Sequence, residues 1–181
     1  MRLRDLTRGA LFVALGILLP IAFHAVGLGK VFLPMHIPVL LAGFFCGPSV
    51  GLLVGMITPL LSGLLTGMPP FVPPVAQAMV FELGVYGLFT GWLYGRWRLG
   101  VYPSLLVAMV AGRLVYGFLG YVILPLFGLK RIPLLAPLTL AFGESLPGVV
   151  LQLVLVPLVV SLVERNAAVL LTGKRAVPSR P

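Results

Sequence analysis

The sequence predicts an all-α integral membrane protein, a compact bundle of six transmembrane helices with both termini in the cytoplasm. Three observations lead to this prediction: the 181 residues are 60% hydrophobic, only 9% are charged, and the mean hydropathy is +1.13. Soluble domains carry about 25% charged residues, so this composition suits lipid rather than water. Six spans of about 20 residues with short loops use nearly the whole length and leave no room for a soluble domain.

Apolar runs bounded by glycine, proline and basic residues define the expected helices. The first run follows an arginine-rich start, and we expect it to be retained as a helix because no small-residue cleavage site follows it. The second run is short and contains Pro34 and Pro38, and the proline-rich run Gly67–Pro74 is expected to be a stiff loop. The expected helices cover residues 6–23, 33–46, 48–65, 75–94, 101–127 and 138–163, followed by a basic cytoplasmic tail over 164–181.

The second run decides the topology, because it is short for a membrane span. If it crosses the bilayer, both termini and most basic residues share one side, as the cytoplasmic bias of Lys and Arg requires. If it does not cross, most of these charges would face outward. The net charge of +9 thus reflects helix ends rather than one patch, so no nucleic-acid partner is expected. The expected cytoplasmic set is Arg2, Arg4, Arg8, Arg96, Arg98, Arg165, Lys174, Arg175 and Arg180, against Lys30, Lys130 and Arg131 outside.

Glycines repeat at intervals of four residues in the third and fourth expected helices. Gly51 and Gly55 lie in one helix, and Gly87, Gly91 and Gly95 lie in the next. Small residues at this spacing let membrane helices approach closely, since lipid gives no hydrophobic driving force between them. We therefore expect these helices to pack tightly. No internal repeat of the kind found in many secondary transporters is visible.

Three ionisable residues, Glu82, Arg113 and Glu144, lie inside the apolar runs. A charge at the bilayer centre costs roughly 2.5–3.5 kcal/mol, so it usually faces a partner, a cavity or a substrate. In the six-span topology all three converge on the outer half of the bundle. Helical spacing places Tyr86 on the face of Glu82 and Tyr116 on the face of Arg113. These groups predict a small-molecule site with apolar walls.

Gln152 lies on the same helical face as Glu144 and joins the predicted site. The alternative is a structural ion pair between Arg113 and one glutamate, and the sequence does not say which glutamate. Such a pair would leave the second carboxylate buried and unpaired, or protonated, which favours a site that needs hydrogen-bond partners. A proton relay is a further alternative.

The sequence predicts no metal site, no cofactor and no enzymatic activity. His36 and His24 are the only histidines, their spacing matches no metal site, and the single cysteine, Cys46, excludes an intramolecular disulfide. His36 is expected to cap a helix, to hydrogen-bond a lid or to contact substrate. No nucleophile lies beside a histidine base and no phosphate-binding glycine motif occurs, so any energy source must be another chain.

Several stretches resemble one family. Residues 10–14 read ALFVA, 35–48 read MHIPVLLAGFFCGP, 51–62 read GLLVGMITPLLS, 67–70 read GMPP and 79–87 read MVFELGVYG. From about residue 6 to 163 the chain resembles the S component of an energy-coupling factor (ECF) transporter, the membrane subunit that captures a vitamin. Segment order, length and the six-helix topology agree with that family.

The resemblance implies how the chain works. Residues 1–163 would form the substrate-binding domain, in the plasma membrane of a prokaryote, with lids that include Met35, Met68 and Phe71. Ala10 and Ala14 would dock on a transmembrane coupling subunit (EcfT-like), and two cytoplasmic ATPases would drive a toppling of the S component that carries substrate inward.

The sequence does not identify the substrate, because one fold can bind many different ligands. Arg113 could receive a carboxylate, as in pantothenate, with Glu82 and Glu144 accepting hydrogen bonds; other cofactor precursors fit as well. The main competing function is a structural subunit of a cell-shape complex (MreD-like) with no small-molecule ligand. A membrane enzyme and a solitary proton-coupled transporter are weaker alternatives.

Overall fold

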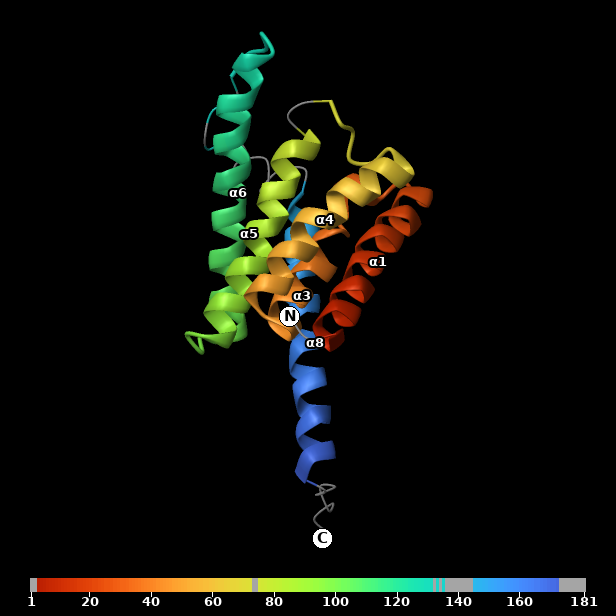
Figure 1. Ribbon diagram of the computed structural model, residues 1–181, viewed down its shortest axis with the longest axis vertical. Helices are drawn as coiled ribbons and strands as arrows, with labels where there is room; N and C mark the ends of the chain where they lie inside the picture. Colours follow the sequence, from red (N-terminus) through yellow and green to blue (C-terminus); the bar gives the residue numbers. More distant parts are fainter. Residues whose placement is uncertain (1–2, 73–74, 132, 134, 136–144, 173–181) are drawn as a thin grey trace.

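The computed structural model describes residues 3–72, 75–131, 133, 135 and 145–172, and all the regular structure in these residues is helical (Figure 1). This confirms the predicted all-α class for the described part of the chain. Glu144, the start of the last expected helix at residue 138, and residues 173–181 of the expected tail lie outside the described residues. The helices are α1 (Leu3–Ala25), α2 (Gly29–Phe32), α3 (His36–Cys46), α4 (Pro48–Thr66), α5 (Val75–Gly95), α6 (Val101–Leu126) and α8 (Leu146–Thr172).

Glycine and proline set the bounds of α4, as the sequence indicates. Gly47, with φ of 83°, separates α3 from α4, and its N–H donates to the carbonyl of Gly43. Pro48 then occupies the first turn of α4, where a missing N–H removes no helical hydrogen bond. The helix ends where Gly67 adopts a left-handed conformation with φ of 72°. α4 therefore begins at the predicted residue and ends one residue later than predicted.

The helix expected at 33–46 begins later than predicted. Leu33 has φ of 47° in the left-handed region, which interrupts the helical backbone between α2 and α3. With 11 residues at about 1.5 Å each, α3 is about 16 Å long, roughly half the hydrocarbon core. Four described helices are long and apolar enough to cross a membrane: α1, α4, α6 and most of α8. α5 has 21 residues but is not among these four, so the six-span count stays a prediction.

The short helix α3 lies at the centre of the fold. Val39, Leu40 and Ala42 are completely buried, and every residue of α3 from His36 to Phe44 is buried. Neighbours from α1, α4, α5 and α8 contact it, which explains how a short apolar helix avoids both water and lipid. The core of the described chain is thus built around α3.

The backbones of α4 and α5 are in contact, which confirms the close approach predicted from the glycines. A Cβ added at Gly51 would lie 2.3 Å from the carbonyl oxygen of Gly87, and one at Gly55 would lie 2.1 Å from that of Leu83. No larger side chain fits at these positions. Gly95 differs, because a Cβ there would meet nothing within 4 Å. The contact therefore does not extend to the end of α5.

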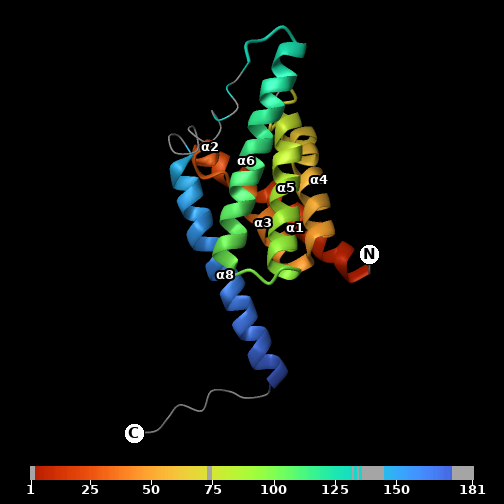
Figure 2. The same cartoon turned by 90° about the vertical axis from the view of Figure 1, so that its left-hand side faces the viewer.

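The two ends of the bundle have different contents (Figures 1 and 2). The α5–α6 turn and the C-terminal part of α8 lie at one end, which carries Arg96, Arg98 and Arg165. Helix α2, the loop that follows α4 and the C-terminal end of α6 lie toward the other end. α8 runs to Thr172, so the first part of the expected tail is helical.

Candidate functional site

A buried ion cluster links α5 and α6. Glu82 is only 1% exposed, and its Oε1 lies 3.1 Å from Nη1 of Arg113. The hydroxyl of Tyr86, one turn further along α5, donates to the same oxygen at 2.9 Å. Charge-assisted hydrogen bonds of this length stabilise a carboxylate that burial would otherwise penalise. Among the described glutamates, Glu82 is therefore the one that pairs with Arg113.

A glycine of α6 determines how Tyr86 lies. A Cβ added at Gly112 would lie 2.1 Å from Cε1 of Tyr86, so the tyrosine ring rests directly on the α6 backbone. Gly112 precedes Arg113, so the same stretch of α6 makes room for the ring and supplies the cation. The cluster is consequently held from both helices.

His36 lies beside this ion cluster but is not hydrogen-bonded to it. Its side chain is 2% exposed, and its Nε2 is 3.8 Å from Oε1 of Glu82, beyond the hydrogen-bond limit of about 3.2 Å. Its ring centroid lies 5.4 Å from that of Tyr86. Within the described part of the chain neither ring nitrogen of His36 has a hydrogen-bond partner. A buried polar group left in this state is uncommon and calls for an explanation.

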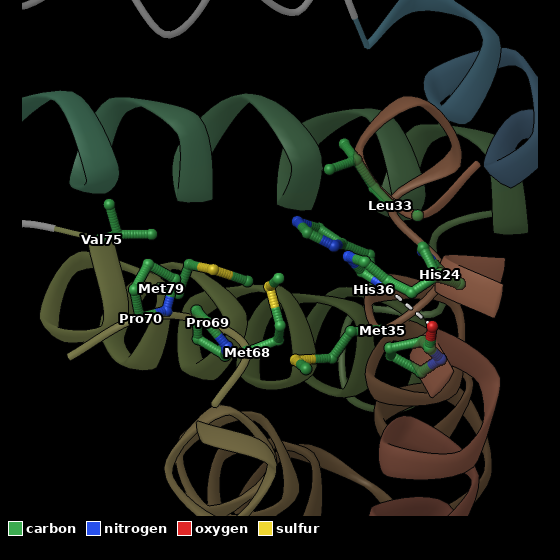
Figure 3. Close-up of a pocket in the computed structure, with 12 residues that line it drawn as sticks. His24, Leu33, Met35, His36, Met68, Pro69, Pro70, Val75 and Met79 are labelled. Carbon is green, nitrogen blue, oxygen red and sulfur yellow. Dashed lines mark hydrogen bonds between the residues drawn. The ribbon is translucent and has the colours of Figure 1, made fainter. Parts of the chain in front are cut away.

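A cavity of about 280 Å³ lies against His36, at the end of the bundle that carries α2 (Figure 3). Its walls come from the end of α1, from α2 and the residues after it, from the loop after α4, and from the start of α5. Prolines and methionines make up most of the lining. The lining residues are Pro20, His24, Gly29, Leu33, Pro34, Met35, His36, Met68, Pro69, Pro70, Val75 and Met79.

The predicted ionisable residues lie beside this cavity rather than in its wall. Glu82, Tyr86 and Arg113 come together as expected, but none of the three is among the lining residues, whereas His36 is. The reason is helical geometry: Met79, one turn before Glu82 on α5, lines the cavity in its place. The spacing of three residues from Glu82 was the sequence signal that could have identified Met79.

Both segments expected to act as lids contribute to the cavity. Met35 and Met68 line it, and Phe71 instead packs on α4, where a Cβ at Gly63 would lie 2.9 Å from its ring. The hydroxyl of Ser62 donates to the carbonyl of Met68 at 2.7 Å, which ties the loop to the end of α4. The loop after α4 is therefore attached to its helix while it covers the cavity.

Two other predicted site residues remain apart from the cavity. Tyr116 is partly buried on α6, one turn after Arg113, and Gln152 is 1% exposed on α8, with its Nε2 unpartnered among the described residues. Neither lines the cavity. Conversely, the sequence interpretation considered His24 only as a metal ligand. In the structure its Nδ1 hydrogen-bonds the carbonyl of Pro20 at 2.8 Å, and its ring lines the cavity.

The comparison with family sequences decides the identity of the chain. The model of the family described as "ECF transporter, substrate-specific component" matches residues 4–165. The chain belongs to this family. Neither a curated protein nor a solved structure matches it at a significant level. As an S component it is the substrate-capture subunit of an ECF transporter and a multi-pass membrane protein, and its family is one of transporter subunits rather than enzymes.

Membership also bears on the competing interpretations. A structural cell-shape subunit is not favoured by a match that covers nearly the whole chain. Across the described residues, no group of three His, Cys, Asp or Glu side chains could hold a metal ion. What an S component needs is a substrate site and a surface for its coupling module.

The S component has a second hollow between α1 and α4. This groove measures about 430 Å³, and Ala10 and Ala14 line it with exposed side chains. The two helices approach closely, because a Cβ at Gly16 would lie 2.5 Å from Cγ2 of Thr58. The alanines predicted for docking thus lie on an accessible surface of α1.

Proposed function

We propose that this S component captures a water-soluble vitamin or cofactor precursor in the cavity beside His36. The observation that carries the proposal is the position of the cavity, under the two segments that precede α3 and follow α4. These segments would open to admit substrate and close over it. The end of the bundle opposite the arginine-rich end would face the outside of a prokaryotic plasma membrane, with both termini in the cytoplasm.

The residues have different roles in this proposal. His36 contacts the substrate, and Met35 and Met68 form part of the lids, with Phe71 attaching the second lid to α4. The cluster of Glu82, Tyr86 and Arg113 supports the wall behind His36 rather than binding substrate directly. Tyr116 and Gln152 do not line the cavity, so neither contacts the substrate directly in this proposal.

Transport would need partners, because the chain has no phosphate-binding motif of its own. We infer that the groove lined by Ala10 and Ala14 receives a helix of a transmembrane coupling subunit. Small side chains permit the close helix approach on which association in lipid depends. Two cytoplasmic ATPases would supply the energy through that subunit.

The proposal is tested on the full chain purified in detergent, with isothermal titration against a panel of water-soluble vitamins and their precursors. One compound should bind with a stoichiometry of one. An Ala10→Trp variant should bind it with the same affinity but fail to co-purify with the coupling subunit, while Leu11→Trp, on an exposed α1 position outside the groove, should behave as wild type. A folded protein that binds no member of the panel would contradict substrate capture.

A further inference from the structure

We propose that the substrate is a compact heteroaromatic compound without net charge, and that His36 hydrogen-bonds its polar group. The inference rests on the proposed function, since it concerns the same cavity. It differs from the expectation drawn from the sequence, in which Arg113 received a carboxylate. The size, walls, charge and polar groups of the cavity support it in turn.

The size and the walls indicate a small, flat, largely apolar ligand. The cavity volume of about 280 Å³ lies just below the range of roughly 300–1,000 Å³ that is usual for small-molecule sites. Four prolines and three methionines line it. Proline rings give rigid apolar surfaces, and methionine thioethers make favourable contacts with aromatic rings while adapting to their shape. Figure 3 shows the side chains of Met35, Met68 and Met79 around the same hollow.

The charge distribution argues against an ionised ligand. Among the side chains that the structure describes, no Asp, Glu, Lys or Arg lines the cavity. The nearest ionisable cluster is already neutralised, because Arg113 lies 3.1 Å from Glu82 and Tyr86 donates to the same carboxylate oxygen. Among the described side chains, an anion would therefore find no free guanidinium at the cavity, and a cation would find no free carboxylate there. Burying either without a partner is unfavourable.

The polar groups of the cavity are imidazoles. Among the described residues neither ring nitrogen of His36 has a hydrogen-bond partner, although the side chain is only 2% exposed and Nε2 lies 3.8 Å from Oε1 of Glu82. A neutral imidazole offers one donor and one acceptor. Nδ1 of His24 hydrogen-bonds the carbonyl of Pro20, and in a neutral ring Nε2 is then an acceptor. A ligand with an adjacent donor and acceptor, such as a carboxamide or an amino-substituted nitrogen heterocycle, satisfies these groups without carrying charge.

The test combines mass spectrometry of compounds released from the purified full chain with titration of probe sets that share a ring and differ in charge. One set is nicotinamide, nicotinate and 3-(aminomethyl)pyridine; a second is pyridoxine, 4-pyridoxate and pyridoxamine. The released compound should be uncharged at neutral pH. Where a set binds, its uncharged member should bind at least about tenfold more tightly than its charged members, because the charged groups lose hydration without gaining a partner.

Two variants locate the polar contact. His36→Phe keeps a ring of similar size but removes hydrogen bonding, and His36→Gln keeps a donor and an acceptor. For the bound compound we expect a loss of at least about tenfold in affinity for the first variant and a smaller loss for the second. Thermal unfolding of both empty variants shows whether they are folded. Leu64→Ala, at an exposed α4 position outside the cavity, is the control and should bind the compound as wild type does.

The outcomes separate the inference from the proposed function. An anionic or cationic ligand of high affinity would overturn the inference and leave substrate capture intact. An uncharged ligand that binds His36→Phe and wild type equally would overturn the role of His36. A folded protein that releases nothing and binds neither the probe sets nor the vitamin panel would contradict the proposed function itself.

Discussion

Helix α5 takes part in two regions that are packed in opposite ways: its contact with α4, and the cavity beside His36. Along the contact, glycines bring two backbones together so closely that a Cβ at Gly87 would lie 2.1 Å from the carbonyl oxygen of Gly51. At the cavity, α5 instead presents Met79 to a hollow of about 280 Å³. Tight packing transmits strain, whereas a hollow lined by methionine adapts to what enters it. The middle of α5 is therefore built for rigid packing and its N-terminal end for binding.

The buried ion cluster lies between these two regions. Glu82 lies one turn from Met79 toward the glycine contact, and Arg113 reaches it from α6. Within the bundle a paired charge costs less than an isolated one, and it restricts which faces of α5 and α6 can meet. The cluster thus fixes the back of the cavity without entering it.

The largest expected effect comes from breaking the glycine contact. Gly87→Leu should lower the free energy of unfolding by more than about 4 kcal/mol, since the new side chain would collide with the backbone of α4. The measurement is an SDS titration followed by circular dichroism in mixed micelles. Gly95→Leu, at the open end of α5, is the control and should unfold like wild type. Equal stability of the two variants would contradict the distinction drawn along α5.

The second largest effect is expected from removing the cation of the buried Glu82–Arg113 pair. Arg113→Ala leaves the Glu82 carboxylate buried without its cation and should lower the free energy of unfolding by about 3–5 kcal/mol. Adding Glu82→Gln to this variant should recover much of the loss, because the uncompensated charge disappears. The same SDS titration measures both. If Arg113→Ala unfolds normally but loses its ligand, Arg113 binds substrate directly, contrary to the geometry described above.

The smallest effect on folding is expected at the cavity itself. Met79→Ala removes a partly buried side chain next to an existing hollow and should lower ligand affinity about tenfold, with less than about 1.5 kcal/mol lost in unfolding. Calorimetric titration with the bound vitamin gives the affinity. Leu64→Ala, at a highly exposed position on α4 outside the cavity, should leave affinity unchanged. A comparable affinity loss in both variants would place the binding site elsewhere.

Much of the helical framework could be predicted because local chemistry determines it. Proline at position 48 and glycine at 67 bound α4, and the apolar length from 101 to 126 agrees with the expected helix within one residue. The start of α3 could not be predicted, because Leu33 interrupts the helix with a left-handed backbone conformation. Leucine has no local preference for that conformation.

The sequence alone determined that this is a helical membrane protein and that α4 and α5 approach closely. It also determined that Glu82 and Arg113 are ionisable residues inside apolar helices. Composition, glycine spacing and the cost of a charge in lipid act locally, so they can be recognised without coordinates. Only the tertiary structure decided that Arg113 pairs with Glu82 and that His36 and Met79 line the cavity. These outcomes depend on the rotation of α3, α5 and α6 about their axes, which packing between helices sets and the spacing of residues along one helix does not.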